Sequence, residues 1–336
     1  MKTDNPVLSV KGLKTSFAVG KQRLQAVNDV SFDVHAGRTL CIVGESGCGK
    51  SVTAHSLLQL LPPNGRIDGG EAIYFKDNAA VDILKLPPKS AKLRALREKE
   101  IGMVFQDPMS SLNPVYRVGD QVMEKILRHK LISRKEARAK VVDLLSQLNI
   151  PEPAARFDDY PHQLSGGMKQ RIMIAIAIIN DPLLLIADEP TTALDVTIQA
   201  QILQILRNIQ RDRNTGVILI THNMGIVAEI ADDIAVMYMG RIVERGSVRQ
   251  VFTRPAHPYT QALMNSVPVL GINRGERLKS IRGVTPDPLA LPAGCAFAPR
   301  CDYATAQCAQ GHPGKTELEA GHCAYCFACG KGGARV

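Results

Sequence analysis

The run GESGCGKS, from Gly44 to Ser51, constrains this chain more than any other part of its sequence. It satisfies the pattern GxxxxGK[ST] and lies between TLCIV, which predicts a strand, and VTAHSLLQLL, which predicts a helix. Glycines let the backbone wrap with successive N–H groups pointing inward, and the dipole of the following helix adds to their attraction for anions. The segment is therefore predicted to be a phosphate cradle.

Two side chains of this cradle have separate expected roles. Lys50 is expected to reach the β and γ phosphates of a nucleotide, and the Ser51 hydroxyl to ligate Mg²⁺. Thr53 lies two residues further along and is the less favoured hydroxyl. A glycine turn that merely carries Lys-Ser is the alternative, which the flanking strand and helix disfavour. The other residues expected to bind the nucleotide are Gly44, Glu45, Ser46, Gly47, Cys48, Gly49 and Val52.

Length and composition are those of an ordinary soluble globular protein. The 336 residues suffice for two domains, or for one large α/β domain with an appendage, and 45% of them are hydrophobic. No stretch approaches the roughly 20 consecutive apolar residues that a membrane span needs. The opening MKTDNPVLSV has no apolar signal core, so we expect a cytoplasmic protein.

A formal charge of +9 is compatible with nucleic acid, an anionic membrane face or simply a nucleotide site as partner. The basic residues are spread through the chain, and the densest cluster, Lys85 to Lys99, is interrupted by Pro and Glu. Such a cluster is typical of a solvated helical face, so it is weak evidence for any partner.

The order of predicted elements indicates an α/β fold. Val7 to Val34 predicts short alternating strands with a turn at Gly20-Lys21, and residues from Ala79 to about Ile150 predict a helical insert. After Pro161 helices and strands alternate, which implies a largely parallel sheet. The predicted elements there are MKQRIMIAIAII (helix), PLLLIADEP (strand), TIQAQILQILRNIQR (helix), GVILITH (strand), MGIVAEIA (helix) and DIAVMYMG (strand).

The chain is predicted to divide near Arg254. Residues 1–253 are expected to form the nucleotide-binding domain, with a helical subdomain at about 85–180. Residues 254–336 are rich in Pro, Gly and Cys and are expected to form a separate terminal module.

Two carboxylates end the apolar strand LLLIADEP. Because ligands of such sheets bind at the carboxyl ends of the strands, Asp188 is suited to hold Mg²⁺ and Glu189 to orient or deprotonate an attacking water. His222 closes the strand GVILITH in the same way and is a candidate sensor of the γ phosphate. A surface turn and a structural histidine are the alternatives for these positions.

A second anion site is predicted at LSGGMKQR. Ser165, Gly166 and Gly167 expose backbone N–H groups at the start of the long helix that follows. One nucleotide does not need two such sites on opposite sides unless two copies of the domain face each other. The sequence therefore predicts a dimer with ATP between its two subunits.

An ordered set of motifs resembles the ATP-binding cassette of ABC transporters, over about Leu8 to Arg249. It comprises GESGCGKS, VFQDP, LSGGM, LLLIADEP, the run Thr192-Ala193-Leu194-Asp195 and His222. The resemblance implies an α/β fold of the ABC-type P-loop NTPases, with a mostly parallel core sheet and an N-terminal antiparallel β subdomain. A helical subdomain insert and a small Cys-rich C-terminal module complete the expected architecture.

The same resemblance implies roles for single residues. Gln106 in VFQDP is expected to contact Mg²⁺ and water and to couple them to a transmembrane partner. Asp195 is expected to contact the opposite subunit, and His222 to be the switch histidine of the catalytic set. Phe17 is the candidate for stacking on adenine, with Phe32 as the alternative reading.

Further motifs resemble the ATPase subunits of dipeptide and oligopeptide importers: QDPMSSLNP, PHQLSGGM, DEPTTALDVTIQAQI and HPYTQALMNSVP. This resemblance implies ATP hydrolysis coupled to peptide uptake. The implied partners are a homologous second ATPase in a heterodimer, two transmembrane permease subunits and an extracytoplasmic peptide-binding protein. The chain would then lie peripherally on the cytoplasmic side of the inner membrane, bound through the permeases.

Six of the eight cysteines fall between Cys295 and Cys329, and in a cytosolic protein such clustering favours a metal centre over disulfides. The segment GCAFAPRCDYATAQC resembles one that is associated with a [4Fe-4S] cluster in the peptide-importer ATPases. The expected ligands are Cys295, Cys301, Cys308 and Cys323, with structural Zn²⁺ as the alternative. Cys326 and Cys329 compete with Cys323 for the last place.

Other functions remain as alternatives. A non-transport cassette that acts on nucleic acid or ribosomes usually has paired cassettes or a long coiled-coil insertion, and this chain has neither. A nucleic-acid-binding zinc ribbon would need two clean CxxC pairs with aromatic and basic residues interleaved. Related importer branches carry nickel, glutathione or antimicrobial peptides. Peptide import without nucleic acid as a partner is therefore the favoured reading.

Overall fold

The computed structural model describes residues 6–77, 79–129, 131–266 and 281–329, which form two compact units. The first unit comprises Met1–Leu8, Val34–Thr39 and Lys85–Ile220. The second comprises Ser9–Asp33, Leu40–Leu84 and Thr221–Val336. Each unit combines segments that are far apart in the sequence, so neither folds from one continuous stretch.

The second unit contains a four-stranded sheet of order β2-β1-β4-β5. The two-residue turn at Gly20-Lys21 joins β1 to β2, as predicted, and such a turn makes the two strands antiparallel. The expectation of several short strands was wrong, because β1 and β2 have 14 residues each. Left-handed backbone at Gly12 and Asp29 is accommodated within these strands. The bounds are β1 Pro6–Val19, β2 Gln22–His35, β4 Gly65–Lys76 and β5 Ala79–Asp82.

Parallel pairing in the second unit leads into the phosphate cradle. β3 (Thr39–Val43) is buried along its whole length and pairs in parallel with β9 (Asp233–Tyr238). Continuous apolar runs of this kind are typical of strands covered on both faces. β9 in turn pairs antiparallel with β10 (Arg241–Ser247), and α1 (Lys50–Leu57) follows β3. Helix α9 spans Met224–Ile230.

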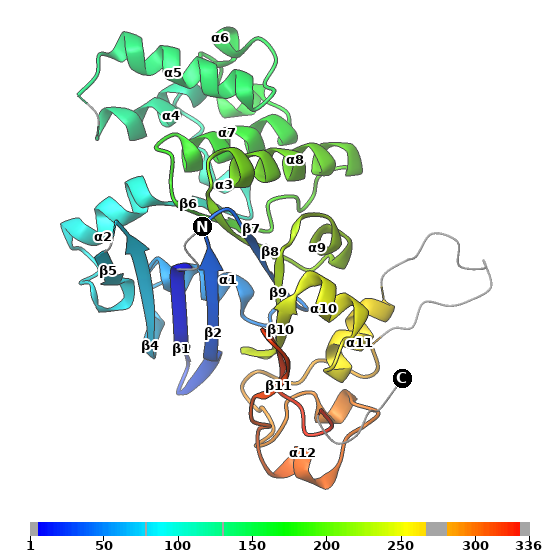
Figure 1. Cartoon of the computed structure of the whole chain (residues 1–336). Helices are drawn as coiled ribbons and strands as arrows, with labels where there is room; N and C mark the ends of the chain where they lie inside the picture. The colour runs from blue at the N-terminus through cyan, green and yellow to red at the C-terminus, as the bar shows by residue number, and fades with distance from the viewer. Residues whose placement is uncertain (1–5, 78, 130, 267–280, 330–336) are drawn as a thin grey trace. The chain divides into compact units, whose positions relative to one another are not determined.

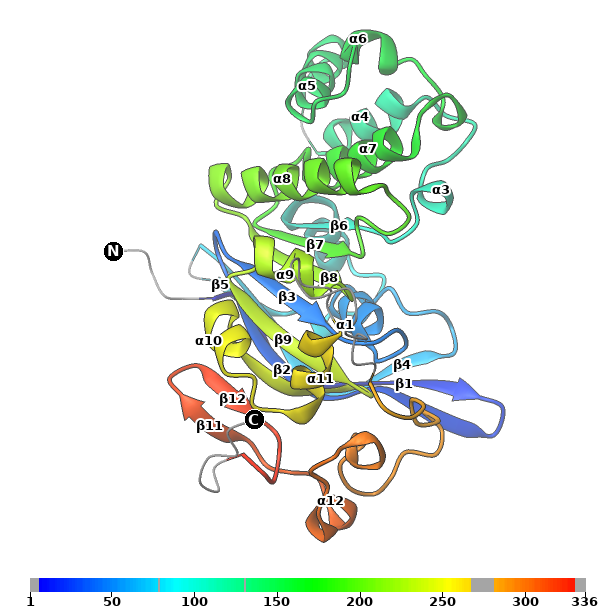
Figure 2. The ribbon, with the colours of Figure 1, turned by 90° about the vertical axis from the view of Figure 1, so that its right-hand side faces the viewer.

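The C-terminal segment extends this sheet. β12 (His322–Ala324) pairs antiparallel with β10, placing Ala324 opposite Glu244, and also pairs antiparallel with β11 (Thr316–Glu319). Figure 2 shows both strands in red close to α10, whose Gln250 Nε2 donates to the carbonyl of Ala320 at 3.2 Å. The helices of this part are α10 Val248–Thr253, α11 Pro258–Asn265 and α12 Ala306–Gln310.

Three parallel strands organise the first unit. β7 (Leu184–Asp188) pairs with β6 (Ile101–Val104) on one side and with β8 (Gly216–Thr221) on the other. The sequence predicted β7, β8, β9 and the helices between them within two residues. It missed β6, because four residues between a basic helical pattern and a loop show little alternation.

Helices cover the remainder of the first unit, as expected for the helical insert. Figure 1 shows α4, α5 and α6 grouped beyond α7 on the side away from β6. Ser133 and Glu136 form a capping box that starts α5, and Arg138 of α5 lies 4.1 Å above the Phe157 ring. The helices are α2 Ala91–Ala95, α3 Pro108–Ser111, α4 Val118–Leu127, α5 Arg134–Gln147, α6 Pro153–Arg156, α7 Gly166–Ile178 and α8 Val196–Asp212.

These units confirm the predicted α/β class with both antiparallel and parallel strands. Among the residues that the structure describes, no helix has the length and apolar character needed to cross a membrane. The parallel strands end at the positions where the sequence places its candidate site residues.

Candidate functional site

The phosphate cradle connects β3 to α1 through backbone that only glycine adopts without strain. Gly44 has φ 154° and Gly49 has φ 104°. A Cβ atom on Gly44 would lie 2.1 Å from the carbonyl oxygen of Met237, and one on Gly49 would lie 2.3 Å from that of Ala26. The glycines thus let this loop pass against neighbouring backbone, while Ser46 remains exposed at its outer turn.

Lys50 is buried at 5% exposure and its ammonium is held inside the loop. Its Nζ donates to the carbonyl oxygens of Gly44 at 2.8 Å and Glu45 at 3.0 Å. The charge therefore sits where the loop wraps, as a phosphate-binding lysine requires. Thr53 donates its hydroxyl to the carbonyl of Gly49 at 2.9 Å, and Ser51 lies in the first turn of α1.

Cys48 is part of the packed side of the cradle, at 2% exposure. Burial raises the pKa of its thiol, and the charge of Lys50 partly opposes this. Near the end of β1, Phe17 is half-buried, and its Cε1 would lie 2.8 Å from a Cβ on Gly65. Phe32 is 2% exposed within β2 and belongs to the core, so Phe17 remains the stacking candidate.

In the first unit the structure brings Gln106 and Glu189 together. Asp188 is the last residue of β7 and is 2% exposed, and Glu189 follows it with φ 44°. Oε2 of Glu189 accepts from Gln106 Nε2 at 3.4 Å and from the Thr192 hydroxyl at 2.8 Å. The backbone N–H of Glu189 donates to the carbonyl of Ile220 at 3.0 Å, so β8 fixes the direction of this turn.

Sequence reasoning did not single out Thr192 as a partner of Glu189. The two lie three residues apart, and only the left-handed turn at Glu189 brings the hydroxyl to the carboxylate. His222 is exposed, one residue beyond β8. It belongs to the second unit, together with the cradle, whereas Asp188 and Glu189 belong to the first.

The LSGGM segment begins α7 as predicted. Ser165 caps this helix by accepting from the backbone N–H of Met168 at 3.4 Å. Gly166 is exposed, and a Cβ on Gly167 would meet Ile198 at 2.7 Å, so α8 can approach only a glycine there. Asp195 caps α8 through Ile198 N–H at 2.9 Å and is itself exposed.

Two family models match successive parts of the chain. Residues 27–192 match the ABC transporter family model, and residues 243–308 match the model for the oligopeptide/dipeptide transporter C-terminal region. The dipeptide transport ATP-binding protein DppD of Bacillus subtilis is 49% identical over 322 residues, 96% of this chain and 94% of that protein. The chain belongs to the ABC transporter family. It is an ATPase subunit of the branch that contains the DppD proteins.

Further comparisons agree with this assignment. The oligopeptide transport ATP-binding protein OppD of Escherichia coli is 48% identical to this ABC ATPase over 321 residues, 96% of this chain and 93% of that one. Among solved structures, the dimeric, ADP- and Pi-bound cassette MJ0796 has a TM-score of 0.63 at 26% identity. That match covers 72% of this chain and 99% of MJ0796, and it confirms the predicted cassette fold.

The C-terminal region of this ABC ATPase contains an apolar cavity of about 130 Å³. Four thiols line it: Cys295, Cys301, Cys308 and Cys326. Among the described residues, no group of three or more His, Cys, Asp or Glu side chains is placed to hold a metal ion. The four cysteines thus share one cavity without forming a recognisable ion site.

The other two C-terminal cysteines do not line the cavity, although the Cys329 thiol contacts that of Cys326. Cys323 is 2% exposed in β12, where it pairs with Arg245 and Glu317, and it does not line the cavity. Cys329 donates its thiol to the carbonyl of Ala256 at 3.3 Å. Of the three candidates for the last ligand, the cavity therefore favours Cys326.

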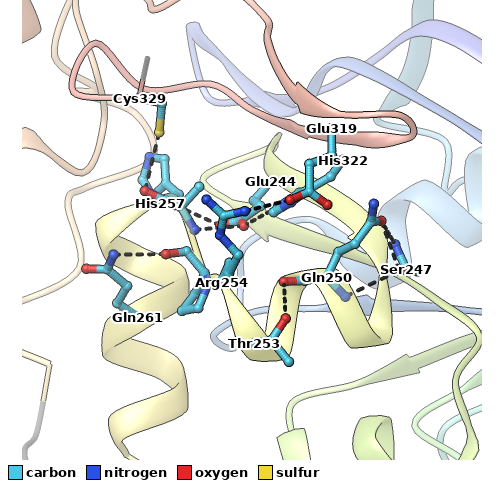
Figure 3. A network of polar contacts seen from close by, with 12 residues as sticks. Glu244, Ser247, Gln250, Thr253, Arg254, His257, Gln261, Glu319, His322 and Cys329 are labelled. Carbon is cyan, nitrogen blue, oxygen red and sulfur yellow. Dashed lines mark hydrogen bonds and ion pairs between the residues drawn. The ribbon is translucent and has the colours of Figure 1, made fainter. Parts of the chain in front are cut away.

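The segment HPYTQALMNSVP forms α11, whose start is tied to β10 and β12 (Figure 3). Its last two residues, 267 and 268, lie outside the described residues. Glu244 of β10 has no exposed surface and accepts from the backbone N–H groups of Ala256 and His257 at 2.9 and 2.8 Å. His257 caps the helix by accepting from Tyr259 N–H at 3.0 Å, and burial lowers the pKa of His257 to about 4.

Proposed function

We propose that this ATPase powers the uptake of dipeptides or oligopeptides across the cytoplasmic membrane. One observation carries the proposal. The same chain matches both the ABC transporter family model and the model for the oligopeptide/dipeptide transporter C-terminal region. Its relatives are dipeptide and oligopeptide transport ATP-binding proteins, and their names support the same substrate class. An importer of nickel, glutathione or antimicrobial peptides is the alternative within the family.

We propose that the nucleotide is held by the cradle and cleaved by residues at the ends of the strands. The buried ammonium of Lys50 and the inward N–H groups of the loop bind the phosphates. Glu189 acts as the base that orients the attacking water, since Gln106 and Thr192 hold one oxygen of its carboxylate. His222 senses the γ phosphate, and Phe17 stacks on the base.

The residues present fit Mg²⁺, because this ion prefers carboxylate, hydroxyl and amide oxygens. Asp188, at the buried end of β7, and Ser51, in the first turn of α1, supply two of these, and Gln106 supplies a third. When bound, the ion supplies positive charge that neutralises the phosphates. Within their own units, the end of β7 fixes Asp188 and the first turn of α1 fixes Ser51.

We propose that the exposed start of α7 binds the nucleotide of a facing cassette. Ser165 and Gly166 are exposed at the N-terminus of a 13-residue helix, and Asp195 is exposed at the start of α8. The solved cassette MJ0796, which this chain resembles, is a dimer. The facing cassette is proposed to be a homologous second ATPase.

We propose that the permease docks on the helical part of the first unit. A groove of about 820 Å³ lies beside α4, and Asn113, Tyr116 and Gln121 contribute to its lining. Val115 and Tyr116 are 71% and 59% exposed next to it. This groove follows the Gln106 loop in sequence, so a partner there would be coupled to Glu189. Two such permease subunits and an extracytoplasmic peptide-binding protein complete the proposed importer, placing this chain on the inner face of the membrane.

We propose that the cysteine cavity holds a [4Fe-4S] cluster through Cys295, Cys301, Cys308 and Cys326. Four thiolates are the ligand set of such a cluster, and they are also a ligand set of zinc. The cluster is favoured over zinc because GCAFAPRCDYATAQC resembles a segment associated with such a cluster in the peptide-importer ATPases, and four thiols line one cavity. Bound there, the cluster would cross-link a loop-rich segment, which is a structural role.

Anaerobic purification tests the cluster. The wild-type protein is expected to be brown, with broad absorbance near 400 nm and matching iron and sulfide contents. Cys326→Ser is expected to lose this absorbance, and the matched variant Cys323→Ser to keep it. A colourless protein with stoichiometric zinc would contradict the cluster, and the opposite behaviour of the two variants would return Cys323 to the ligand set.

Peptide import is tested in cells and in membranes. Lys50→Ala is expected to abolish ATP binding and the uptake of a labelled dipeptide, whereas the control Lys14→Ala in β1 is expected to affect neither. Mass spectrometry of the complex purified in detergent should find two permeases and a second ATPase. Uptake that continues unchanged in the Lys50→Ala strain, or a complex without permeases, would contradict the proposed function.

A further inference from the structure

A residue of the Cys-rich segment binds directly to the phosphate cradle. Arg300 lies between Cys295 and Cys301 in sequence, and its guanidinium grips the carboxylate of Glu45 with two bonds. Nη1 donates to Oε2 at 2.7 Å and Nη2 donates to Oε1 at 2.9 Å. The side chain of Arg300 is 5% exposed and that of Glu45 is 24% exposed. This is a bidentate, largely desolvated ion pair.

The guanidinium is held in place from the other side. Its Nε donates to the carbonyl of Arg282 at 3.0 Å, and Nη1 also lies 3.3 Å from the Tyr238 hydroxyl. The rings of Tyr238 and Phe297 each lie with their centroids 5.9 Å from its central carbon. Arg300 is therefore fixed before any nucleotide binds.

Tyr259 of the HPY segment makes a second bond to the same cradle residue. The backbone N–H of Glu45 donates to the Tyr259 hydroxyl at 2.8 Å. Tyr259 is fully buried and packs on Tyr238 and Phe297, with ring centroids 4.5 and 5.4 Å apart. Both the backbone and the side chain of Glu45 are thus bound by the C-terminal segment.

The ion pair between Arg300 and Glu45 bears on nucleotide binding because Glu45 carries a negative charge within the cradle. A polyphosphate carries several negative charges, and a free carboxylate within the cradle would repel it. Lys50 already donates to the carbonyl oxygen of Glu45, so this residue lies beside the phosphate-binding ammonium. A guanidinium paired to the carboxylate offsets this repulsion and fixes the Glu45 side chain.

We propose that Arg300 is a positioning residue for ATP, which acts through Glu45 by neutralising its charge and fixing the cradle. The C-terminal segment is then part of the nucleotide site. This inference rests on the proposed binding of ATP at the cradle, and it adds that residues beyond the cassette match set the affinity.

Two substitutions that each remove a charge test this inference. The dissociation constant of ATP is measured for each variant by competition with a fluorescent ATP analogue. Arg300→Gln is expected to weaken binding about tenfold, because it leaves a partly buried carboxylate without its cationic partner beside the phosphates. Adding Glu45→Gln removes that carboxylate and is expected to restore affinity to within about threefold of wild type. The rescue is the signature of an electrostatic role, since a merely structural loss would not be repaired.

The controls separate this inference from the proposed function. Arg254→Gln removes an exposed arginine paired with Glu319, outside the contacts of Arg300, and is expected to leave ATP affinity unchanged. Thermal unfolding and iron content report whether Arg300→Gln still folds and keeps its cavity occupied. Wild-type affinity in Arg300→Gln, or a double variant as weak as the single one, would overturn the inference. If Lys50→Ala and all of these variants still bound ATP with wild-type affinity, the proposed function would be overturned instead.

Discussion

Nε2 of His322 lies 2.8 Å from Oε1 of Glu244, and neither side chain has more than 2% of its surface exposed. The contact joins β12, near the C-terminal end of the described chain, to β10. The same carboxylate accepts the two backbone N–H groups that precede α11 (Figure 3). One buried carboxylate therefore connects three segments of the C-terminal region.

Glu244→Ala is expected to destabilise the protein strongly. It removes the acceptor of three donors, two of them buried, and removing one partner of a buried charged contact costs about 3–5 kcal/mol. The thermal midpoint should fall by roughly 5–10 °C. The matched control is Arg254→Ala, which breaks the exposed ion pair with Glu319 in the same region and should shift the midpoint by less than about 2 °C. Equal shifts would contradict the role of Glu244.

His257 is expected to make stability depend on pH. Burial lowers its pKa to about 4 in the folded chain, from its ordinary value of 6.5. Below pH 6.5 the unfolded chain therefore binds a proton that the folded chain does not, so stability is lost as the pH falls from about 6.5 towards 4. Between pH 7 and 5 the loss should reach about 2 kcal/mol.

Denaturant unfolding at these two pH values checks this expectation. His257→Asn is the control, because an Asn side chain also accepts the N–H bond that caps α11 but does not titrate. Wild type should lose about 2 kcal/mol more than His257→Asn on acidification. An identical loss in both proteins would show that His257 does not carry the effect.

Glu189→Gln is expected to stop turnover without preventing ATP binding. The substitution keeps an oxygen for the bonds from Gln106 and Thr192 but removes the base, which should lower the ATPase rate at least about 100-fold. Steady-state hydrolysis by the assembled transporter and direct ATP titration measure the two effects. Thr192→Val should lower the rate less, since the carboxylate remains. Near-normal hydrolysis by Glu189→Gln would mean that the base is misassigned.

Ser165→Ala is expected to impair hydrolysis in the assembled transporter beyond its effect on folding. It removes the cap of α7 and should cost about 1 kcal/mol of stability. Ser133→Ala removes the comparable cap of α5 and should cost a similar amount. Comparison of their melting curves and ATPase rates isolates the anion-binding role, because only Ser165 is proposed to face a nucleotide. A rate loss shared equally by both variants would refute that role.

Gly44→Ala and Gly47→Ala are expected to differ sharply. A Cβ on Gly44 would lie 2.1 Å from the carbonyl oxygen of Met237, so the loop must move and ATP binding should be lost. Gly47 has open space around its Cβ position and only the strain of φ 79°, about 1–2 kcal/mol. Nucleotide titration of both variants checks the order. Equal affinities would mean that the close backbone approach at Gly44 is unimportant.

Much of the cassette was predictable from local pattern. The helix and strand patterns after Pro161 located α7, β7, α8, β8, α9 and β9. The spacing of apolar residues in each segment reflects which faces of the helix or strand are buried. The short strand β6 and the lengths of β1 and β2 were not predictable, because strand pairing at a distance decides whether a weak pattern continues.

The amino-acid sequence alone determined the family, the cradle and the candidate catalytic side chains, because these depend on residue types at fixed spacings. The tertiary structure decided which side chains meet. It placed Cys326 in the cavity and Cys323 in a strand, although both fit a CxxC spacing. It also brought Arg300 to Glu45 across 255 positions, since side-chain contacts over such separations depend on how the segments pack and not on local pattern.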